Sequence, residues 1–122
     1  MAKPKILIAG SWNFSNYELL EKQCDYYLQR FTKYGGSIEV VNGRHGGADM
    51  HARQYAYNRM FNYKSFKITP NKFMKNMSAM LDYIDCAIIF WDGETRGAKY
   101  LIEACKSRQL KYRVVNYIQS LE

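Results

Sequence analysis

The stretch CAIIFWDGETRGA, residues 86–98, decides the fold of this chain. Its first six residues form the strongest apolar run in the sequence, and a short continuous run of this kind is typical of a strand buried on both faces. Asp92-Gly93 ends the run with a common turn pair. Apolar residues then recur at helical spacing: Ala98, Leu101, Ile102 and Cys105. The stretch therefore predicts a buried strand, a glycine-containing loop and a helix, in this order.

The same alternation extends over the whole chain. Further strands are predicted within residues 6–9, 38–41, 64–68 and 113–118, and apolar stripes at helical spacing lie within 17–31, 48–60 and 73–84. Alternation with short connections favours parallel strands joined by right-handed crossovers. We therefore predict one α/β domain over residues 1–122. It is a doubly wound Rossmann-like fold, in which about four helices flank a mainly parallel five-stranded sheet.

The net charge and the cysteines limit which kinds of partner and which cellular compartment are expected. The chain has 122 residues and a net charge of +7, which favours anionic partners, although its Lys and Arg residues are scattered. Its three cysteines, Cys24, Cys86 and Cys105, contain no C-x-x-C pair, so neither a zinc site nor a disulfide framework is predicted. Free cysteines in apolar stripes indicate a reducing, cytoplasmic setting. No stretch approaches membrane-spanning length, so no membrane partner is predicted.

Ligands of doubly wound sheets bind outside the carboxyl ends of the strands, and three of these ends carry unusual loops here. The first loop contains Gly10, Ser11, Trp12 and Asn13. Gly10 permits a sharp exit from the strand, and the side chains of Ser11 and Asn13 can donate hydrogen bonds to an anion. Trp12 either stacks on a base or packs against the helix that follows.

The second loop is rich in glycine and leads into a helix. Its candidate ligand-binding residues are Gly43, Arg44, Gly46, Gly47, Ala48 and Asp49. Glycines at a helix start expose backbone N–H groups at the positive end of the helix dipole, which suits an anion. Arg44 adds a planar guanidinium that matches phosphate, whereas Asp49 either contributes to the site or caps the helix.

The third loop contributes Asp92, Gly93, Thr95, Arg96 and Gly97. Thr95 supplies a hydroxyl and Arg96 a positive charge. Carboxylates repel phosphate, so Asp92 suits a ribose hydroxyl better, and its alternative role is turn chemistry. Together the three loops predict a site for a phosphate-bearing, nucleotide-type ligand, with no metal and no cofactor.

Three segments resemble the SLOG superfamily, the Rossmann-like fold shared by Smf/DprA and the LOG proteins. They are Gly10-Ser11, Gly43 with Gly47-Ala48-Asp49, and the run from Asp85 through Gly93 to Gly97. The resemblance covers nearly the whole chain and is greatest to small bacterial and phage domains related to YspA and YpsA. It implies binding of nucleotides or nucleotide-derived molecules at the glycine-rich loops. It also implies association of copies into homodimers or higher homo-oligomers through helices.

The chain departs from the pattern of these relatives at several positions. An arginine that follows Gly-Ser in relatives is Trp12 here, and the arginine before Gly-Ala-Asp is Gly46, with Arg44 as a substitute. An Arg-Asn pair of relatives falls on Asn76 and Met77 or, with a one-residue slip, on Lys75 and Asn76. The glutamate that LOG-type enzymes use in glycosidic cleavage corresponds to Leu101, which cannot assist a leaving group or activate water.

Three hypotheses follow from the loops and the resemblance. The first is binding or sensing of a nucleotide-type ligand without catalysis, including sequestration of a signalling nucleotide. The second is hydrolysis of a nucleotide N-glycosidic or phosphate bond, with Asp49, Asp92 or Glu94 as acid or base. The third is a Smf/DprA-like module that binds single-stranded DNA, which the positive charge and the tyrosine content suggest. We predict the first and assign no catalytic residue.

Overall fold

A computed structural model describes residues 3–33, 35–43 and 48–118, in which strands and helices alternate as the sequence predicts. The elements are β1 (Lys5–Gly10), α1 (Tyr17–Thr32), β2 (Glu39–Asn42), α2 (Ala48–Arg59), β3 (Asn62–Ser65), the 3-10 turn η1 (Pro70–Lys72), α3 (Phe73–Tyr83), β4 (Cys86–Trp91), α4 (Arg96–Ser107) and β5 (Lys111–Asn116). The five strands form one parallel sheet, which confirms the predicted α/β Rossmann-like fold.

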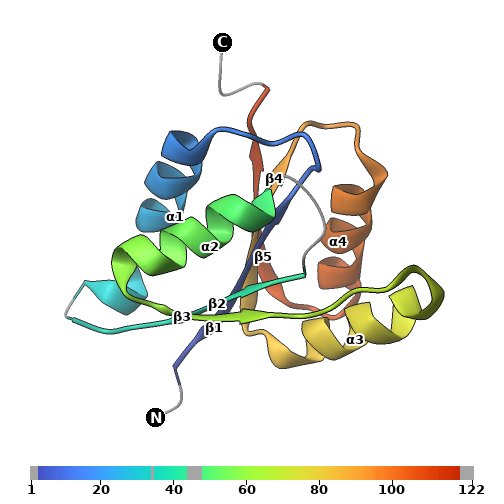
Figure 1. Ribbon diagram of the computed structural model, residues 1–122, viewed down its shortest axis with the longest axis horizontal. Coiled ribbons are helices and arrows are strands. Elements are labelled where there is room, and N and C mark those ends of the chain that lie inside the picture. Colours follow the sequence, from blue (N-terminus) through green and yellow to red (C-terminus); the bar gives the residue numbers. More distant parts are fainter. Residues whose placement is uncertain (1–2, 34, 44–47, 119–122) are drawn as a thin grey trace.

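The strand order of the sheet is β3-β2-β1-β4-β5. From β1 the chain builds outward through β2 to β3, and α3 then carries it back across the sheet to β4, on the other side of β1 (Figure 1). The direction of winding therefore reverses between β1 and β4. In open α/β sheets, the crevice beyond the carboxyl ends of the strands at such a reversal is where ligands bind.

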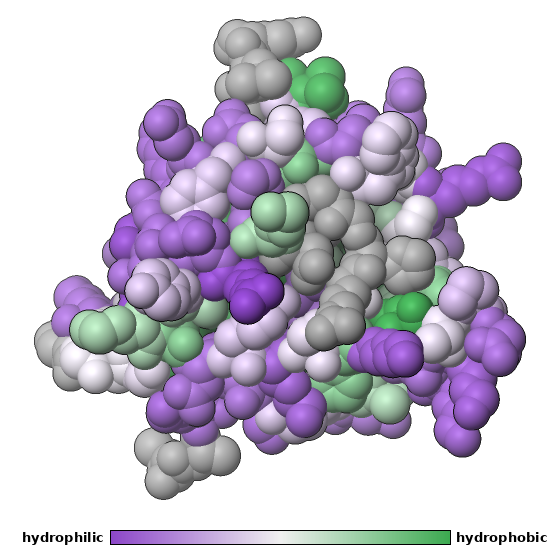
Figure 2. Space-filling view, viewed as in Figure 1, coloured by the Kyte–Doolittle hydropathy of each residue, from purple (hydrophilic) through white to green (hydrophobic). Residues whose placement is uncertain are grey.

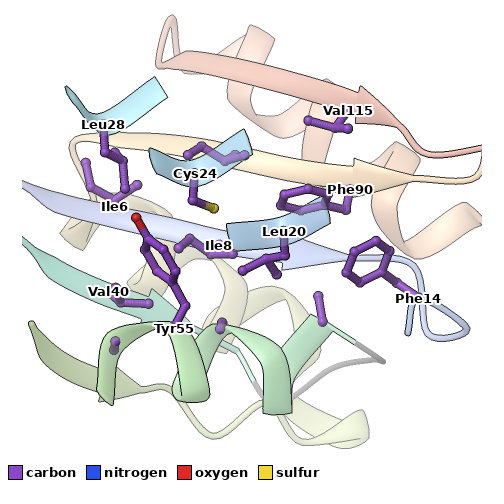
Figure 3. Close-up of a cluster of buried hydrophobic side chains, with 14 of the residues drawn as sticks. Ile6, Ile8, Phe14, Leu20, Cys24, Leu28, Val40, Tyr55, Phe90 and Val115 are labelled. Atoms are coloured by element: carbon purple, nitrogen blue, oxygen red, sulfur yellow. The ribbon is translucent and has the colours of Figure 1, made fainter. Parts of the chain in front are cut away.

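The helices cover the sheet in pairs, with α1 and α2 on one face and α3 and α4 on the other (Figure 1). Strand side chains point alternately to the two faces, so Ile6 and Ile8 pack under α1 and α2 whereas Leu7 packs under α3 and α4. Figure 3 shows the first of these layers, in which Leu20 and Cys24 of α1 face the sheet. Burial on both faces explains why β1 and β4 are continuous apolar runs in the sequence.

Two edge strands and one helix end differ from the sequence prediction. β3 begins at Asn62 and β5 at Lys111, two residues before the predicted starts, because pairing with β2 and β4 sets their limits. Met60 was expected in the apolar stripe of the second helix but is 89% exposed. It adopts a left-handed conformation with φ of 57°, which ends α2 after Arg59 and turns the Met60 side chain toward solvent.

Most of the face in Figure 2 is hydrophilic, and its hydrophobic areas are small and separate. Among the described helices, none combines the length and the apolar character needed to cross a bilayer. Cys24 and Cys105 are buried and Cys86 is half-buried, and all three are free thiols.

Asp25 of α1 joins α1 to α2 through one polar cluster. Its carboxylate accepts hydrogen bonds from the Tyr55 hydroxyl at 2.7 Å and from Arg59 at 2.6 and 3.0 Å. Tyr55 is only 1% exposed, and Figure 3 shows its hydroxyl oxygen pointing toward the region between Ile6 and Leu28. The hydrogen bonds from Arg59 are the main cause that lowers the pKa of Asp25 below its usual value.

We expect Asp25→Ala to destabilise the protein by about 2 kcal/mol, because the buried Tyr55 hydroxyl then loses its acceptor. Asp25→Asn keeps an acceptor oxygen for Tyr55 and loses only the half-exposed ion pair, so about 1 kcal/mol is expected. Urea unfolding of the wild type and both variants measures these differences.

The contribution of the Asp25 charge also depends on pH. The pKa of Asp25 is lowered in the folded state, so the stabilisation is complete above the unfolded pKa of about 3.9 and is lost as the pH falls through the folded pKa. The stability difference between wild type and Asp25→Asn should therefore persist at neutral pH and vanish in strong acid. A difference that did not change with pH would contradict the role of the charge.

Candidate functional site

A cavity of about 170 Å³ lies at the carboxyl ends of β1 and β2 and extends to the residues after β4, so it reaches the point between β1 and β4 where the strand order reverses. Residues that follow β1, the last residue of β2 with Gly43, and the start of α4 contribute to its wall. Residues of α3 and Ile68 complete the described lining. The lining residues are Ala9, Gly10, Ser11, Trp12, Asn42, Gly43, Ile68, Phe73, Met77, Met80, Thr95, Gly97, Ala98 and Leu101.

Ser11 connects the end of β1 to the end of β4 and to the start of α4. Its backbone N–H donates to the Phe90 carbonyl at 2.8 Å, and its hydroxyl accepts from the Asp92 N–H at 3.2 Å. The Ser11 and Thr95 hydroxyls form a hydrogen bond of 2.6 Å. Ser11 is 1% exposed, so its side chain fixes the first and third loops relative to each other.

Asp92 organises the third loop rather than lining the cavity. Its Oδ1 atom accepts hydrogen bonds from the backbone N–H groups of Glu94 at 2.9 Å and Thr95 at 2.8 Å. The bond from the Thr95 N–H is the largest of the effects that lower the pKa of Asp92, so the carboxylate is ionised at neutral pH. This is the turn chemistry that the sequence left as an alternative, and the other oxygen, Oδ2, lies 3.5 Å from the Asn13 amide nitrogen.

Asn42 is a lining residue that the sequence prediction missed. It is 2% exposed, and its side-chain amide donates to the Ile8 carbonyl at 2.6 Å. The paired register of β1 and β2 ends at Leu7 and Val41, so the Asn42 side chain continues the link between the strands beyond this point. A polar residue at the last position of a buried strand was the signal that could have identified it.

The predicted site residues fall into groups. Six line the cavity together: Gly10, Ser11, Trp12, Gly43, Thr95 and Gly97. Six others do not belong to its lining: Asn13, Lys75, Asn76, Asp92, Gly93 and Arg96. Ala48 begins α2 and is buried. Arg44, Gly46 and Gly47 lie outside the described residues, as does the side chain of Asp49.

Two of the predicted residues outside the lining have structural contacts instead. The Asn76 side chain accepts hydrogen bonds from the Thr69 N–H at 3.0 Å and the Thr69 hydroxyl at 3.1 Å, which fixes the approach to α3. Asn13 accepts a hydrogen bond from the Tyr117 hydroxyl at 2.6 Å. Trp12, by contrast, is 74% exposed, so it does not pack against α1, and it contributes to the rim of the cavity.

The wall of the cavity is more apolar than the sequence indicated. Phe73, Met77 and Met80 of α3 and Leu101 of α4 line it, and none of these four was predicted as a binding residue. Leu101 occupies the position at which the resemblance places a catalytic glutamate. The described lining contains no Asp or Glu, so within it no carboxylate is placed to act as acid or base.

The size and lining of the cavity limit what it can hold. Pockets that enclose whole small molecules measure about 300–1,000 Å³, whereas an apolar cavity of about 150 Å³ holds one benzene ring. A cavity of about 170 Å³ therefore takes one ring-sized, uncharged part of a ligand. The first turn of a helix leaves N–H groups without partners in the helix, and Gly97 and Ala98 of this turn belong to the lining. Its positive dipole end favours an anionic group there.

Among the described residues, no group of three or more His, Cys, Asp or Glu side chains is arranged to hold a metal ion. Comparison of the chain with protein-family models, curated proteins and solved structures found no match. The resemblance to the SLOG superfamily therefore stays a prediction from the residues quoted above.

Proposed function

We propose that the chain binds a nucleotide or nucleotide-derived ligand at the carboxyl edge of its sheet, without cleaving it. The observation that carries this proposal is the cavity between the first loop, Gly43 and the start of α4. The cavity has an apolar part large enough for one aromatic ring, and this part adjoins the N-terminus of α4. A nucleotide has the same two parts, an uncharged ring system and a phosphate.

The chemistry of the lining indicates where the base and the phosphate of the ligand would each bind. The apolar wall of Met77, Met80 and Leu101 suits part of the base, because burying a phosphate there would leave its charge unpaired. The phosphate fits the first turn of α4 at Gly97 and Ala98, whose N–H groups are not the ones that donate to Asp92, and the helix dipole stabilises negative charge there. Leu101 lines the cavity at the position where the resemblance places the glutamate of LOG-type enzymes, and this supports binding over hydrolysis.

The direct test is to identify what the purified protein carries. The protein is denatured, and the released small molecules are identified by mass spectrometry. In parallel, a library of nucleotides is screened for thermal stabilisation, since a ligand at one hundred times its Kd stabilises the fold by about 2.7 kcal/mol. If no nucleotide-like molecule is released and no library member raises the Tm, the proposal is wrong. Release of free base from a bound nucleotide would favour the hydrolase hypothesis instead.

Trp12 is expected to stack on the exposed part of the ligand. Stacking of a base on an aromatic ring contributes about 1–3 kcal/mol, so Trp12→Ala should weaken ligand binding by roughly 5- to 150-fold. Because the Trp12 side chain is 74% exposed, the substitution should leave the free energy of unfolding nearly unchanged. Titration calorimetry with the ligand and urea unfolding measure the two effects.

Tyr57→Ala is the matched control, because Tyr57 is an 80% exposed aromatic residue of α2 that does not line the cavity. It should leave the affinity unchanged. Equal affinities of wild type and Trp12→Ala would exclude stacking on Trp12.

A further inference from the structure

A second hollow lies on the α1 face of the sheet, apart from the cavity at the carboxyl edge. It is a groove of about 480 Å³ between the second half of α1 and the edge strand β5, with Cys86 and Ile88 of β4 at its base. An adjoining hollow of about 440 Å³ shares Arg30, Phe31, Cys86 and Lys111 with it. This α1–β5 groove shares no lining residue with the candidate ligand site.

The α1–β5 groove is positively charged. Arg30, Lys111 and Arg113 line it; its described lining contains no Asp or Glu, whereas Asp85 lines the adjoining hollow. None of the three cations forms an ion pair with another described residue. All three lie near the Cys86 thiol, whose pKa is raised mainly by burial; each of the three cations opposes this effect, and the Asp85 carboxylate adds to it. Three cations against the one carboxylate of Asp85, whose Oδ2 atom accepts a hydrogen bond from the Lys5 N–H, leave the described surroundings of Cys86 positively charged, which suits an anionic partner.

The strand beside the groove is the last strand of the sheet as far as the structure describes it. β5 pairs with β4 on one side and with no described strand on the other. Its exposed Lys111 and Arg113 point to the α1 face, about 7 Å apart along the strand, whereas Tyr112 and Val114 are half-buried on the α4 face. Extended peptides bind such edges by adding a strand, and their alternate side chains then meet the two faces of the sheet.

Two other occupants fit the groove less well. Binding of single-stranded nucleic acid uses a basic groove that follows the backbone and successive ring faces on which the bases stack. Here Tyr26 and Tyr27 contact each other edge to face at 5.3 Å, and the Arg30 guanidinium lies 4.7 Å from the Phe31 ring centre. A second copy of the chain paired through β5 would bring Lys111 and Arg113 against their own equivalents, and like charges on paired strands repel.

We propose that β5 accepts an extended segment of another protein as a sixth strand, and that this segment alternates acidic with apolar residues. Its carboxylates face Arg30, Lys111 and Arg113 in the α1–β5 groove, and its apolar side chains continue the layer of Tyr112 and Val114. Backbone hydrogen bonds to the edge of β5 provide affinity, and the alternation provides specificity. This inference does not rest on nucleotide binding.

The test uses a short synthetic peptide in which glutamate alternates with valine, labelled for fluorescence anisotropy. We expect it to bind the full chain, and we expect a peptide of the same composition with contiguous glutamates to bind at least tenfold more weakly. Lys111→Glu with Arg113→Glu should weaken binding of the alternating peptide by at least about tenfold. Lys67→Glu with Lys106→Glu makes the same change in net charge outside the groove and should leave binding unchanged.

Cys86 provides a second measurement inside the groove, because it is the one half-buried cysteine and the other two are buried. Bound peptide should slow its alkylation by iodoacetamide in the wild type but not in the Lys111→Glu, Arg113→Glu variant. Gly97→Phe, which alters only the nucleotide cavity, should leave peptide binding intact, so the two proposals can fail separately.

Three results would overturn the inference. The first is equal loss of binding in the two double variants, which would show attraction to net charge alone. The second is tighter binding of a single-stranded oligonucleotide than of the peptide through Lys111 and Arg113. The third is a dimer in size-exclusion chromatography that the Lys111→Glu, Arg113→Glu variant dissociates.

Discussion

Gly97→Phe is expected to weaken nucleotide binding by at least 100-fold, or about 3 kcal/mol. Gly97 lies in the first turn of α4 and lines the cavity, and a Cβ atom added to it would meet no described atom within 4 Å beyond its chain neighbours and its own helix backbone. Gly97 is exposed, so a phenylalanine can stand at this position of the lining without a clash at its Cβ atom. There it competes with the ligand for the cavity and covers the N–H groups of the helix start. Titration of the nucleotide identified by ligand release measures the loss.

Lys99→Phe is the control for this variant, because it places the same side chain on an exposed position of α4 outside the cavity lining. It should retain the wild-type affinity. Near-wild-type affinity of Gly97→Phe would show that the nucleotide binds elsewhere. A comparable loss in Lys99→Phe would show that the effect is not specific to the cavity.

Gly10→Ala should have the largest effect on stability, a loss of about 3 kcal/mol, or roughly 10 °C in Tm. An added Cβ would lie 2.7 Å from the Phe90 carbonyl oxygen and 3.1 Å from the Cβ atoms of Phe90 and Ala48. The nearest of these atoms belongs to the backbone of β4, which no side-chain rotation can move away. The ends of β1 and β4 would have to separate, which also strains the 2.8 Å hydrogen bond from the Ser11 N–H to Phe90.

The same substitution at Gly97 is the matched comparison. Gly97→Ala places its methyl group in open space and replaces glycine inside a helix, so it should stabilise the protein by about 0.5–1 kcal/mol. Urea unfolding of the two alanine variants should therefore give changes of opposite sign. Two changes of the same sign and size would contradict the role assigned to the contact between Gly10 and Phe90.

Much of the fold could be predicted because its signals are local. The apolar run 86–91 and the stripes of the helices reflect burial of particular faces, and this burial has a different period in strands and helices. The misplaced starts of β3 and β5 have a different cause. Both are edge strands with alternating burial, so their limits depend on the strand beside them rather than on their own residues.

The candidate site was predictable in part. Gly10, Ser11, Gly43, Thr95 and Gly97 were identified because glycine and hydroxyl residues at the ends of parallel strands must lie along one edge. The role of Asp92 could not be chosen from the sequence, since a ribose contact and a turn use the same carboxylate. In the structure, hydrogen bonds from the Glu94 and Thr95 N–H groups occupy its Oδ1 atom.

The sequence by itself determined the parallel α/β architecture and the edge of the sheet at which its glycine loops gather. Only the tertiary structure decided that Ser11 bonds Thr95, that Met77 and Met80 wall the cavity with Leu101, and that Arg30 of α1 lies beside Lys111 and Arg113 of β5. The physical reason is that the spacing of apolar residues shows which face of a helix or strand is buried. It does not show which distant helix or strand packs against that face. That choice depends on the crossover through α3, which joins segments far apart in the chain.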